Sequence, residues 1–398
     1  MNRLLPDQRR YDLDWLRILA ILAVFVFHTS RFFDIDDWSI KNATTYPDLH
    51  LWTNFPSHWL MPLIFVISGM STFYALGTRG AGRFLKDRAL RLLVPLVVGI
   101  FTHVMVQVYL ERVSHGQFSG SFFAFIPHYF DGMYAFGGNF AWMGLHLWYL
   151  ELLFVFSLLL LPLFRWLKHG AGQRAAAHLT SFLARPLAIY LLALPVLLLL
   201  NLFSPASILG NRGFGGWSMP IYILFLGYGF LLVGSDGVQQ AIVRQRWLSL
   251  ILSVFLVLTL IELGIERGDA VFGTPRYALL FSLFGLSAWC WILVCLGFGR
   301  QHLNVNTPWL HYLNEAVLPF YVLHQSVLIF LGYFVVQWAL PAGVKWLIIA
   351  MTSFVIIAAL YDLLVRRVNV LRFLFGMRPL PKMEVRHVPS GPLGSPRS

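Results

Sequence analysis

Residues 11–33 read YDLDWLRILAILAVFVFHTSRFF, and from residue 15 onward the stretch is mostly apolar, although it contains Arg17 and His28. A run of about 20 apolar residues is long enough to cross the hydrocarbon core of a bilayer. In lipid, each backbone polar group must be satisfied within its own segment, so such a run is predicted to be a helix. The stretch therefore indicates an all-α, polytopic integral membrane protein.

Similar apolar runs recur along the whole chain. They are continuous rather than alternating, which excludes the strands of a porin-type barrel. The same length criterion predicts about ten transmembrane helices, at residues 15–33, 59–76, 89–109, 145–167, 186–203, 217–233, 247–265, 277–297, 319–338 and 345–365.

The composition excludes an ordinary soluble fold. Of 398 residues, 58% are hydrophobic and 12% are charged, with a mean hydropathy of +0.68, and a soluble domain of this size needs more polar surface. The net charge of +12 arises from residues in loops and at helix ends, which indicates membrane topology and no nucleic-acid partner. Cys290 and Cys295 share one apolar run, so neither a disulfide framework nor a metal site is predicted.

The basic residues also predict the orientation of the chain. They precede the odd-numbered predicted helices, while the alternate loops hold few, and positively charged loops stay in the cytoplasm. Both termini are therefore expected in the cytoplasm, for a multi-pass protein of the cell (inner) membrane. The first span lacks a small-residue cleavage site, so we expect a retained anchor in contact with membrane lipids. The residues that carry this signal are Arg9, Arg10, Arg79, Arg83, Lys86, Arg88, Arg165, Lys168, Arg174, Arg185, Arg244, Arg246, Arg300, Arg366, Arg367, Arg372 and Arg378.

Two connections that are predicted to face outward, residues 34–58 and 111–144, are longer than a turn requires. The second is dense in phenylalanine and tyrosine, which favours a short interfacial or re-entrant helix. Residues 1–376 are predicted to form one transmembrane domain. Residues 377–398, rich in Pro, Gly, Ser and Arg, are predicted to be a disordered cytoplasmic tail.

Ionisable side chains inside a span are costly and are candidates for function. Arg17 and His28 are eleven residues apart, which places them within about 20° of one helix face and roughly 16 Å apart along the axis. Arg17 would lie near the cytoplasmic end, and His28 in the outer half. His28 could act as a general base or a nucleophile. The alternatives are a snorkelling arginine and a structural histidine.

Arg88 and Arg91 form an Arg-x-x-Arg pattern that is expected to open the third helix. At this spacing both guanidiniums project from one side, with the helix N-terminus behind them, and guanidinium binds phosphate bidentately. The alternative is a plain topology signal. Ser68 and Gly69, in the second helix, permit close helix approach and predict packing.

A second cluster, His146, Trp148, Tyr149 and Glu151, lies at the predicted outer end of the fourth helix. The first three residues are candidates for contacting the substrate, although aromatic side chains are also common at membrane interfaces. Glu151 could orient or stabilise an imidazole, or form a structural salt bridge. His324 is expected in the cytoplasmic third of the ninth helix, at the depth of Arg17 rather than of His28.

In their order along the chain, these motifs resemble acyltransferase family 3 of integral membrane proteins. The shared features are Tyr11-Asp-Leu-Asp-Trp-Leu-Arg17 with His28, the segment ending in Val-Ile-Ser68-Gly69, Arg88-x-x-Arg91, His146-Leu-Trp148 and Tyr321-x-x-His324. The resemblance covers the chain to about Gly376. Within the family the chain is most similar to the glucans biosynthesis protein C group.

The resemblance implies transfer of an acyl group, acetyl or succinyl, from cytosolic acyl-CoA to a carbohydrate hydroxyl at the extracytoplasmic face. A periplasmic glucan is one such acceptor. It implies His28 as the essential histidine and Arg17 as its partner. Arg88 and Arg91, with Arg17, are expected to hold the CoA phosphates, and His324 to lie on the donor side. Glu151 does not carry over from the family pattern, so its catalytic role rests on burial alone.

Several questions stay open at the level of sequence. His28 could deprotonate the acceptor or carry the acyl group as an acyl-imidazole. A transporter of a small anionic or lipid-linked solute would also use intramembrane His and Arg, but no inverted repeat is evident. A sensor or assembly factor would leave the pairing of Arg17 with His28 unexplained. The oligomeric state is undetermined.

Overall fold

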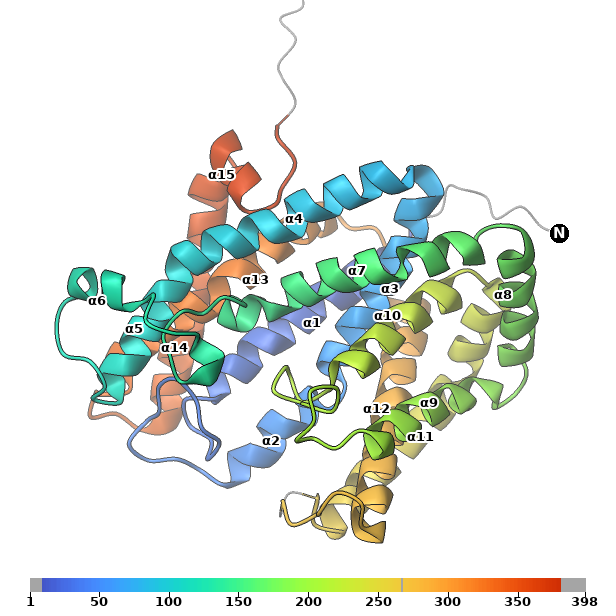
Figure 1. Ribbon diagram of the computed structural model, residues 1–398, viewed down its shortest axis with the longest axis horizontal. Helices are drawn as coiled ribbons and strands as arrows, with labels where there is room; N and C mark the ends of the chain where they lie inside the picture. Colours follow the sequence, from blue (N-terminus) through green and yellow to red (C-terminus); the bar gives the residue numbers. More distant parts are fainter. Residues whose placement is uncertain (1–8, 266–267, 381–398) are drawn as a thin grey trace, which may run out of the picture.

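The computed structural model describes residues 9–265 and 268–380, and within these ranges the chain is helical, with a single isolated β-bridge between Met133 and Phe140. The helices pack as one bundle, with short helices and loops at its ends (Figure 1). The all-α fold class is confirmed for this part of the chain.

Seven helices in the described ranges are long and apolar enough to cross a membrane. An eighth span is formed if α4 (Ala81–Phe101) and α5 (His103–Ser114), which bend by 41° at their junction, are counted as one. Two shorter apolar helices, Ala188–Leu202 and Met219–Val233, coincide with two further predicted spans. The count of ten and the cytoplasmic placement of the termini therefore stay predictions. The seven are Tyr11–Ser30, Asp48–Thr78, Leu145–Leu167, Asp236–Glu262, Pro275–His302, Pro308–Val335 and Ala342–Val365.

Several of these spans are made of more than one element. The second combines α2 (Asp48–Ser57) with α3 (Leu60–Thr78), and the third joins the 3₁₀ turn Leu145–Leu147 to α7 (Trp148–Leu167). The last combines α14 (Ala342–Ala359) with a π-helical turn, Leu360–Val365. The remaining elements are α6 (Phe122–His128), the 3₁₀ turns Tyr134–Phe136 and Ala188–Leu192, α8 (Gly170–Leu183), α9 (Ala193–Leu202), α10 (Met219–Val233) and α15 (Asn369–Leu374).

Three helices begin well before their apolar runs. They are α4, α11 (Asp236–Glu262) and α13 (Pro308–Val335), predicted to begin at residues 89, 247 and 319. Polar and basic residues extend each helix beyond the apolar stretch, which the hydropathy criterion alone does not register. In α13, the predicted first residue, Pro319, lies inside the helix, and Pro308 opens it. This shift places His324 deeper in the helix than expected.

Close packing of α3 against α10 supports the centre of the bundle. A Cβ on Gly69 would collide with the backbone carbonyl of Leu226, and a Cβ on Gly229 with that of Val66. Only glycine allows the two backbones to approach this closely. The packing role predicted for Ser68-Gly69 is therefore confirmed for the glycine.

The site is built mainly on α1 (Tyr11–Ser30), which packs against α13, α12 (Pro275–His302) and α3. Hydrogen bonds join Arg17 to Asn314 and His28 to His324, so α1 and α13 run in the same direction side by side (Figure 1). The two pairs are eleven residues apart on α1 and ten on α13. The expected shared face of Arg17 and His28 is thus the face toward α13.

The predicted helix in the aromatic connection 111–144 is present as α6. Arg112 fixes this connection by donating to the Asn139 side chain and the Gly138 carbonyl, both at 2.8 Å. Phe123 and Phe136 are 80% and 85% exposed, and the interfacial position of this helix stays a prediction. Of the predicted tail, residues 377–380 are described and ordered against α15, and residues 381–398 lie outside the described residues.

Candidate active site

A pair of histidines lies where α1 meets α13. The Nδ1 atom of His28 is 2.9 Å from the Nε2 atom of His324, and the two ring planes differ by 8°. The Trp38 ring, from the connection after α1, lies nearly parallel to the His28 ring, with 6.0 Å between centroids. We call His28 and His324 the histidine pair. The expectation that His324 lies at the depth of Arg17 is wrong, because α13 starts eleven residues earlier than predicted.

The hydrogen bonds assign the tautomers of this pair. Nδ1 of His324 is 2.6 Å from the carbonyl oxygen of Tyr321, which can only accept, so this nitrogen carries the proton. Nε2 of a neutral His324 is then an acceptor, and Nδ1 of His28 donates to it. The remaining nitrogen of His28, Nε2, keeps its lone pair. An imidazole in this state can take a proton or attack a carbonyl.

The ring of His28 lines a cavity of about 90 Å³. Trp148 and His146, both predicted to contact the substrate, also line it, together with Tyr321 and Ser57. Its walls are mostly apolar and contain no Lys, Arg, Asp or Glu side chain of the described residues. A cavity with a few polar groups beside a free imidazole nitrogen is a suitable place for a neutral reactant.

A buried polar network around His146 packs against the histidine pair. Nε2 of His146 donates to the Val322 carbonyl at 3.0 Å, so its Nδ1 accepts from Gln107. Gln107 also donates to the Ser326 hydroxyl, which is hydrogen-bonded to Nδ1 of His103 at 2.6 Å. Neither ring nitrogen of His146 is therefore free for a substrate, and this residue contributes only a ring surface to the cavity. Sequence reasoning missed Gln107 and Ser326, although a glutamine within an apolar helix was a usable signal.

Toward the N-terminal end of α1 lies the arginine cluster, Arg17, Arg88 and Arg91. Arg17 donates to Ser71 at 2.7 Å and to Asn314 at 3.4 Å, with Asp14 at 3.7 Å. Arg88 donates to the Thr72 hydroxyl at 2.5 Å and stacks over Phe84. In the described chain, Arg91 forms no side-chain hydrogen bond or ion pair.

Tyr149 belongs to this side of the site. Its hydroxyl is 2.6 Å from Ser68, and Arg17 and Arg88 are its electrostatic neighbours. Its ring meets Tyr321 edge to face at 6.0 Å, and Tyr321 lines the cavity beside His28. The two tyrosines thus link the arginine cluster to the histidine pair. The cavity itself does not reach the arginines, so a single open tunnel stays a prediction.

Two further expectations need correction. Arg88 and Arg91 do not open their helix, because α4 begins two turns earlier at Ala81, and the helix N-terminus does not contribute to their site. Glu151 has no hydrogen bond or ion pair within the described residues, and its Oε2 atom is buried without a partner. His324, not Glu151, is the residue that orients His28.

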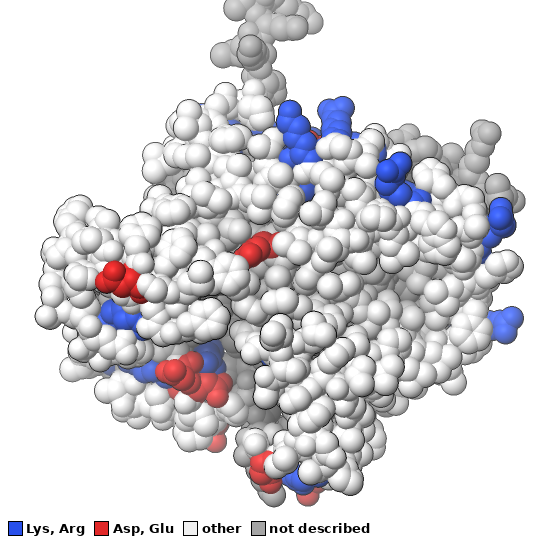
Figure 2. Space-filling model, in the orientation of Figure 1, with Lys and Arg blue, Asp and Glu red and all other residues white. Residues whose placement is uncertain are grey.

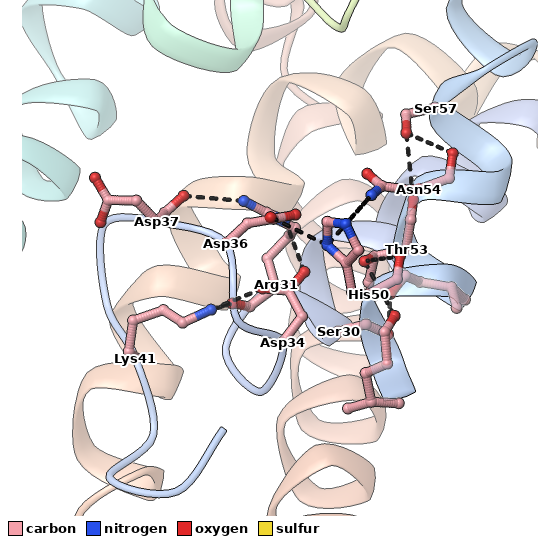
Figure 3. A network of polar contacts seen from close by, with 12 residues as sticks. Ser30, Arg31, Asp34, Asp36, Asp37, Lys41, His50, Thr53, Asn54 and Ser57 are labelled. Carbon is pink, nitrogen blue, oxygen red and sulfur yellow. Dashed lines mark hydrogen bonds and ion pairs between the residues drawn. The ribbon is translucent and has the colours of Figure 1, made fainter. Parts of the chain in front are cut away.

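At the C-terminal end of α1 the charges are arranged differently. Arg31 binds Asp34 at 2.7 Å and Asp36 at 2.5 Å, and Lys41 binds Asp34 at 2.7 Å. Figure 3 shows how these side chains, which we call the ion network, converge beside α2 with His50 and Asn54. The Ser57 hydroxyl at the end of α2 belongs to the same group and also lines the cavity. The network holds the connection that carries Trp38.

Comparison with known families finds a match to an acyltransferase domain, acyltransferase 3, over residues 10–362. Glucans biosynthesis protein C of Salmonella paratyphi B (strain ATCC BAA-1250 / SPB7) is 23% identical over 390 residues, covering 96% of this chain and 98% of the relative. The protein of the same name from Salmonella paratyphi A is 24% identical over the same shares. No solved structure is significantly similar to the chain.

Proposed function

Because the chain belongs to the acyltransferase 3 family, we propose that it is a membrane O-acyltransferase that moves a short acyl group from acyl-CoA to a carbohydrate hydroxyl. The observation that carries this proposal is the histidine pair: a hydrogen bond fixes the His28 ring and leaves a lone pair on its Nε2 atom, and His28 lines the cavity. The proposed setting is the cell inner membrane, with the N-terminal end of α1 toward the cytoplasm.

The arginine cluster is proposed to bind the phosphates of the donor. Arg17 and Arg88 have hydroxyl and amide partners, Arg91 has no side-chain partner in the described chain, and Asp14, 3.7 Å from Arg17, is the nearest carboxylate. Such an excess of positive charge is favourable when an anion is bound, and guanidinium suits phosphate oxygens. The pantetheine arm would then extend past Tyr149 and Tyr321 toward His28. Acetyl-CoA and succinyl-CoA are the proposed donors.

The chemistry can follow two routes with the same overall balance. In the direct route, Nε2 of His28 takes the proton of the acceptor hydroxyl, the hydroxyl oxygen attacks the thioester carbonyl, and the C–S bond breaks. The leaving thiolate recovers the proton from His28, which gives an ester and free CoA thiol. In the covalent route, Nε2 first attacks the thioester carbonyl, the C–S bond breaks and the thiolate leaves with the acyl group bound to Nε2. The acceptor hydroxyl then attacks the acyl-imidazole and gives up its proton to the thiolate, which yields the ester, the CoA thiol and free His28.

The acceptor is proposed to approach His28 through the cavity. The Trp148 ring and the apolar wall suit the face of a sugar, and Ser57 offers a hydroxyl. Curated relatives carry the name glucans biosynthesis protein C, which favours a glucan as the acceptor.

The proposal is tested with the full chain reconstituted in lipid vesicles. Acetyl-CoA or succinyl-CoA is supplied on one side and a glucan on the other, while free thiol and glucan ester are measured together. We expect both products in equal amounts and only when both substrates are present. A single turnover without glucan separates the routes, because only the covalent route leaves acyl-protein. Movement of a solute without ester formation would contradict the enzyme and support a transporter.

A further inference from the structure

The chain continues past the family match into a short segment that is firmly held. After α14 and its π-helical turn, α15 leads into residues 375–380. Arg372, 4% exposed, donates to the carbonyls of Arg366 at 3.0 Å and Arg378 at 2.6 Å and binds Glu315 at 2.6 Å. Asn369 accepts from the Leu380 amide at 2.8 Å. A buried cation thus fixes the backbone at Arg378.

This segment is packed directly on the arginine cluster. α15 contacts α4, and a Cβ added to Gly376, whose φ is +68°, would lie 2.5 Å from the Arg91 carbonyl oxygen. The glycine therefore allows both the left-handed turn and the close approach. The electrostatic neighbours of the Arg91 guanidinium are three cations, Arg17, Arg378 and Arg79, and one carboxylate, Asp87. In Figure 1, α15 lies beside α4.

The charges in this place are poorly compensated. Asp87 pairs with Arg79 at 2.5 Å, but neither Arg91 nor the exposed Arg378 has a carboxylate partner in the described part of the chain. Bringing like charges together is unfavourable unless an anion or solvent compensates them. An exposed arginine could point elsewhere, yet the clamp made by Arg372 holds the Arg378 backbone at the cluster.

We propose that Arg378 and Arg91 form a subsite for the phosphorylated nucleotide end of the donor, so that the C-terminal segment completes the donor site. This inference rests on the proposed function, because it requires a donor that carries phosphates. The family match ends at residue 362 and does not include the segment.

The test compares donors with and without phosphate groups. For Arg378→Gln, we expect the KM for acetyl-CoA to rise about tenfold, as for the loss of one charged hydrogen bond, with kcat unchanged. The KM for S-acetylpantetheine, which has no phosphate, should be the same in the variant and the wild type. Arg378→Lys should recover part of the affinity for acetyl-CoA.

Arg367→Gln is the matched control. Arg367 is an exposed arginine near α15 that pairs with Asp362, and it is not among the electrostatic neighbours of Arg91. Its removal should leave both donors unaffected. If Arg378→Gln changes neither KM, or changes both by the same factor, the subsite is wrong. If the wild type transfers from neither donor, the proposed function itself fails, which is a distinct result.

Discussion

The two ends of α1 differ in whether their basic side chains are paired with carboxylates. Near its N-terminal end, Arg17 and Arg88 of the arginine cluster donate to hydroxyl and amide groups, and the nearest carboxylate is Asp14, 3.7 Å from Arg17. Beyond its C-terminal end, Arg31 pairs with Asp34 and Asp36 in the ion network, and Lys41 pairs with Asp34. On the face shown in Figure 2, basic side chains predominate along the upper edge, whereas acidic and basic side chains lie together on the lower left.

This difference separates cations that stabilise the fold from cations that can bind a ligand. A cation whose charge is met by a carboxylate mainly holds the fold, because removal of either partner leaves a buried charge. A cation without such a partner is available to an anionic ligand. The histidine pair lies between the two ends, and in its neutral form it is suited to chemistry rather than to charge pairing. Substitutions at each place should therefore affect different measurements.

The largest effect is expected at His28. His28→Ala removes the free Nε2, and we expect kcat to fall about a thousandfold, the usual range for a general base. The KM for acyl-CoA and the thermal stability should change little, because the arginine cluster remains. A variant with normal transfer and an intact fold would exclude His28 from the chemistry.

At the opposite end, Asp34→Asn should damage the fold. Asp34 is fully buried and accepts from both Arg31 and Lys41, so the substitution leaves two cations without their shared carboxylate. We expect a loss of about 3 kcal/mol in unfolding free energy. Thermal unfolding in detergent measures it. The donor KM of the remaining folded protein should stay normal, and a changed KM with unchanged stability would reverse the comparison.

The orienting role of His324 is tested by two substitutions. His324→Leu removes the acceptor for Nδ1 of His28, and we expect kcat to fall about 50-fold, as for loss of a group that fixes a tautomer. His324→Gln places an amide oxygen near the former Nε2 and should retain most of the activity. Equal activity of the two variants would show that the residue only fills space.

Arg88→Gln should act on donor binding alone. We expect the KM for acyl-CoA to rise about twentyfold with kcat nearly constant, because a charged contact to phosphate is lost. Its stability should match that of the wild type, in contrast to Asp34→Asn. Initial rates at varied donor concentration are measured together with unfolding temperatures. If the cluster were structural, Arg88→Gln would lose as much stability as Asp34→Asn.

The smallest effect concerns the connection 111–144, which Ser114 joins to the region of the ion network through the Ser39 carbonyl. Burial raises the pKa of Tyr129 in this connection to about 12, from an ordinary value of 10.0. Between these values the unfolded chain loses the proton and the folded chain keeps it, so stability falls as pH rises. At pH 11 we expect the free energy of unfolding to be lower by about 1 kcal/mol. Tyr129→Phe should lack this part of the decline in unfolding temperature.

Much of the site could be named from the sequence. Arg17 and His28 stand out because a charged or titratable side chain in an apolar run is costly, and the structure brings both to α13. Trp148 does line the cavity. The partner of His28 could not be found in this way. Pro319 is the predicted helix start, which places His324 at the wrong depth, and burial alone suggests Glu151 as the group that orients an imidazole.

The sequence by itself determined that the described chain folds as helices, because long apolar runs in lipid must satisfy their backbone groups locally. It also determined which side chains are energetically costly inside a membrane span and are therefore candidates for function. Only the tertiary structure decided which of them meet. Three contacts depend on the axial offset between helices that are far apart in the chain. They are the contact of His28 with His324, the contact of Gly376 with Arg91, and the close approach of α3 to α10. That offset is set by side-chain packing between helices, and local periodicity contains no information about it.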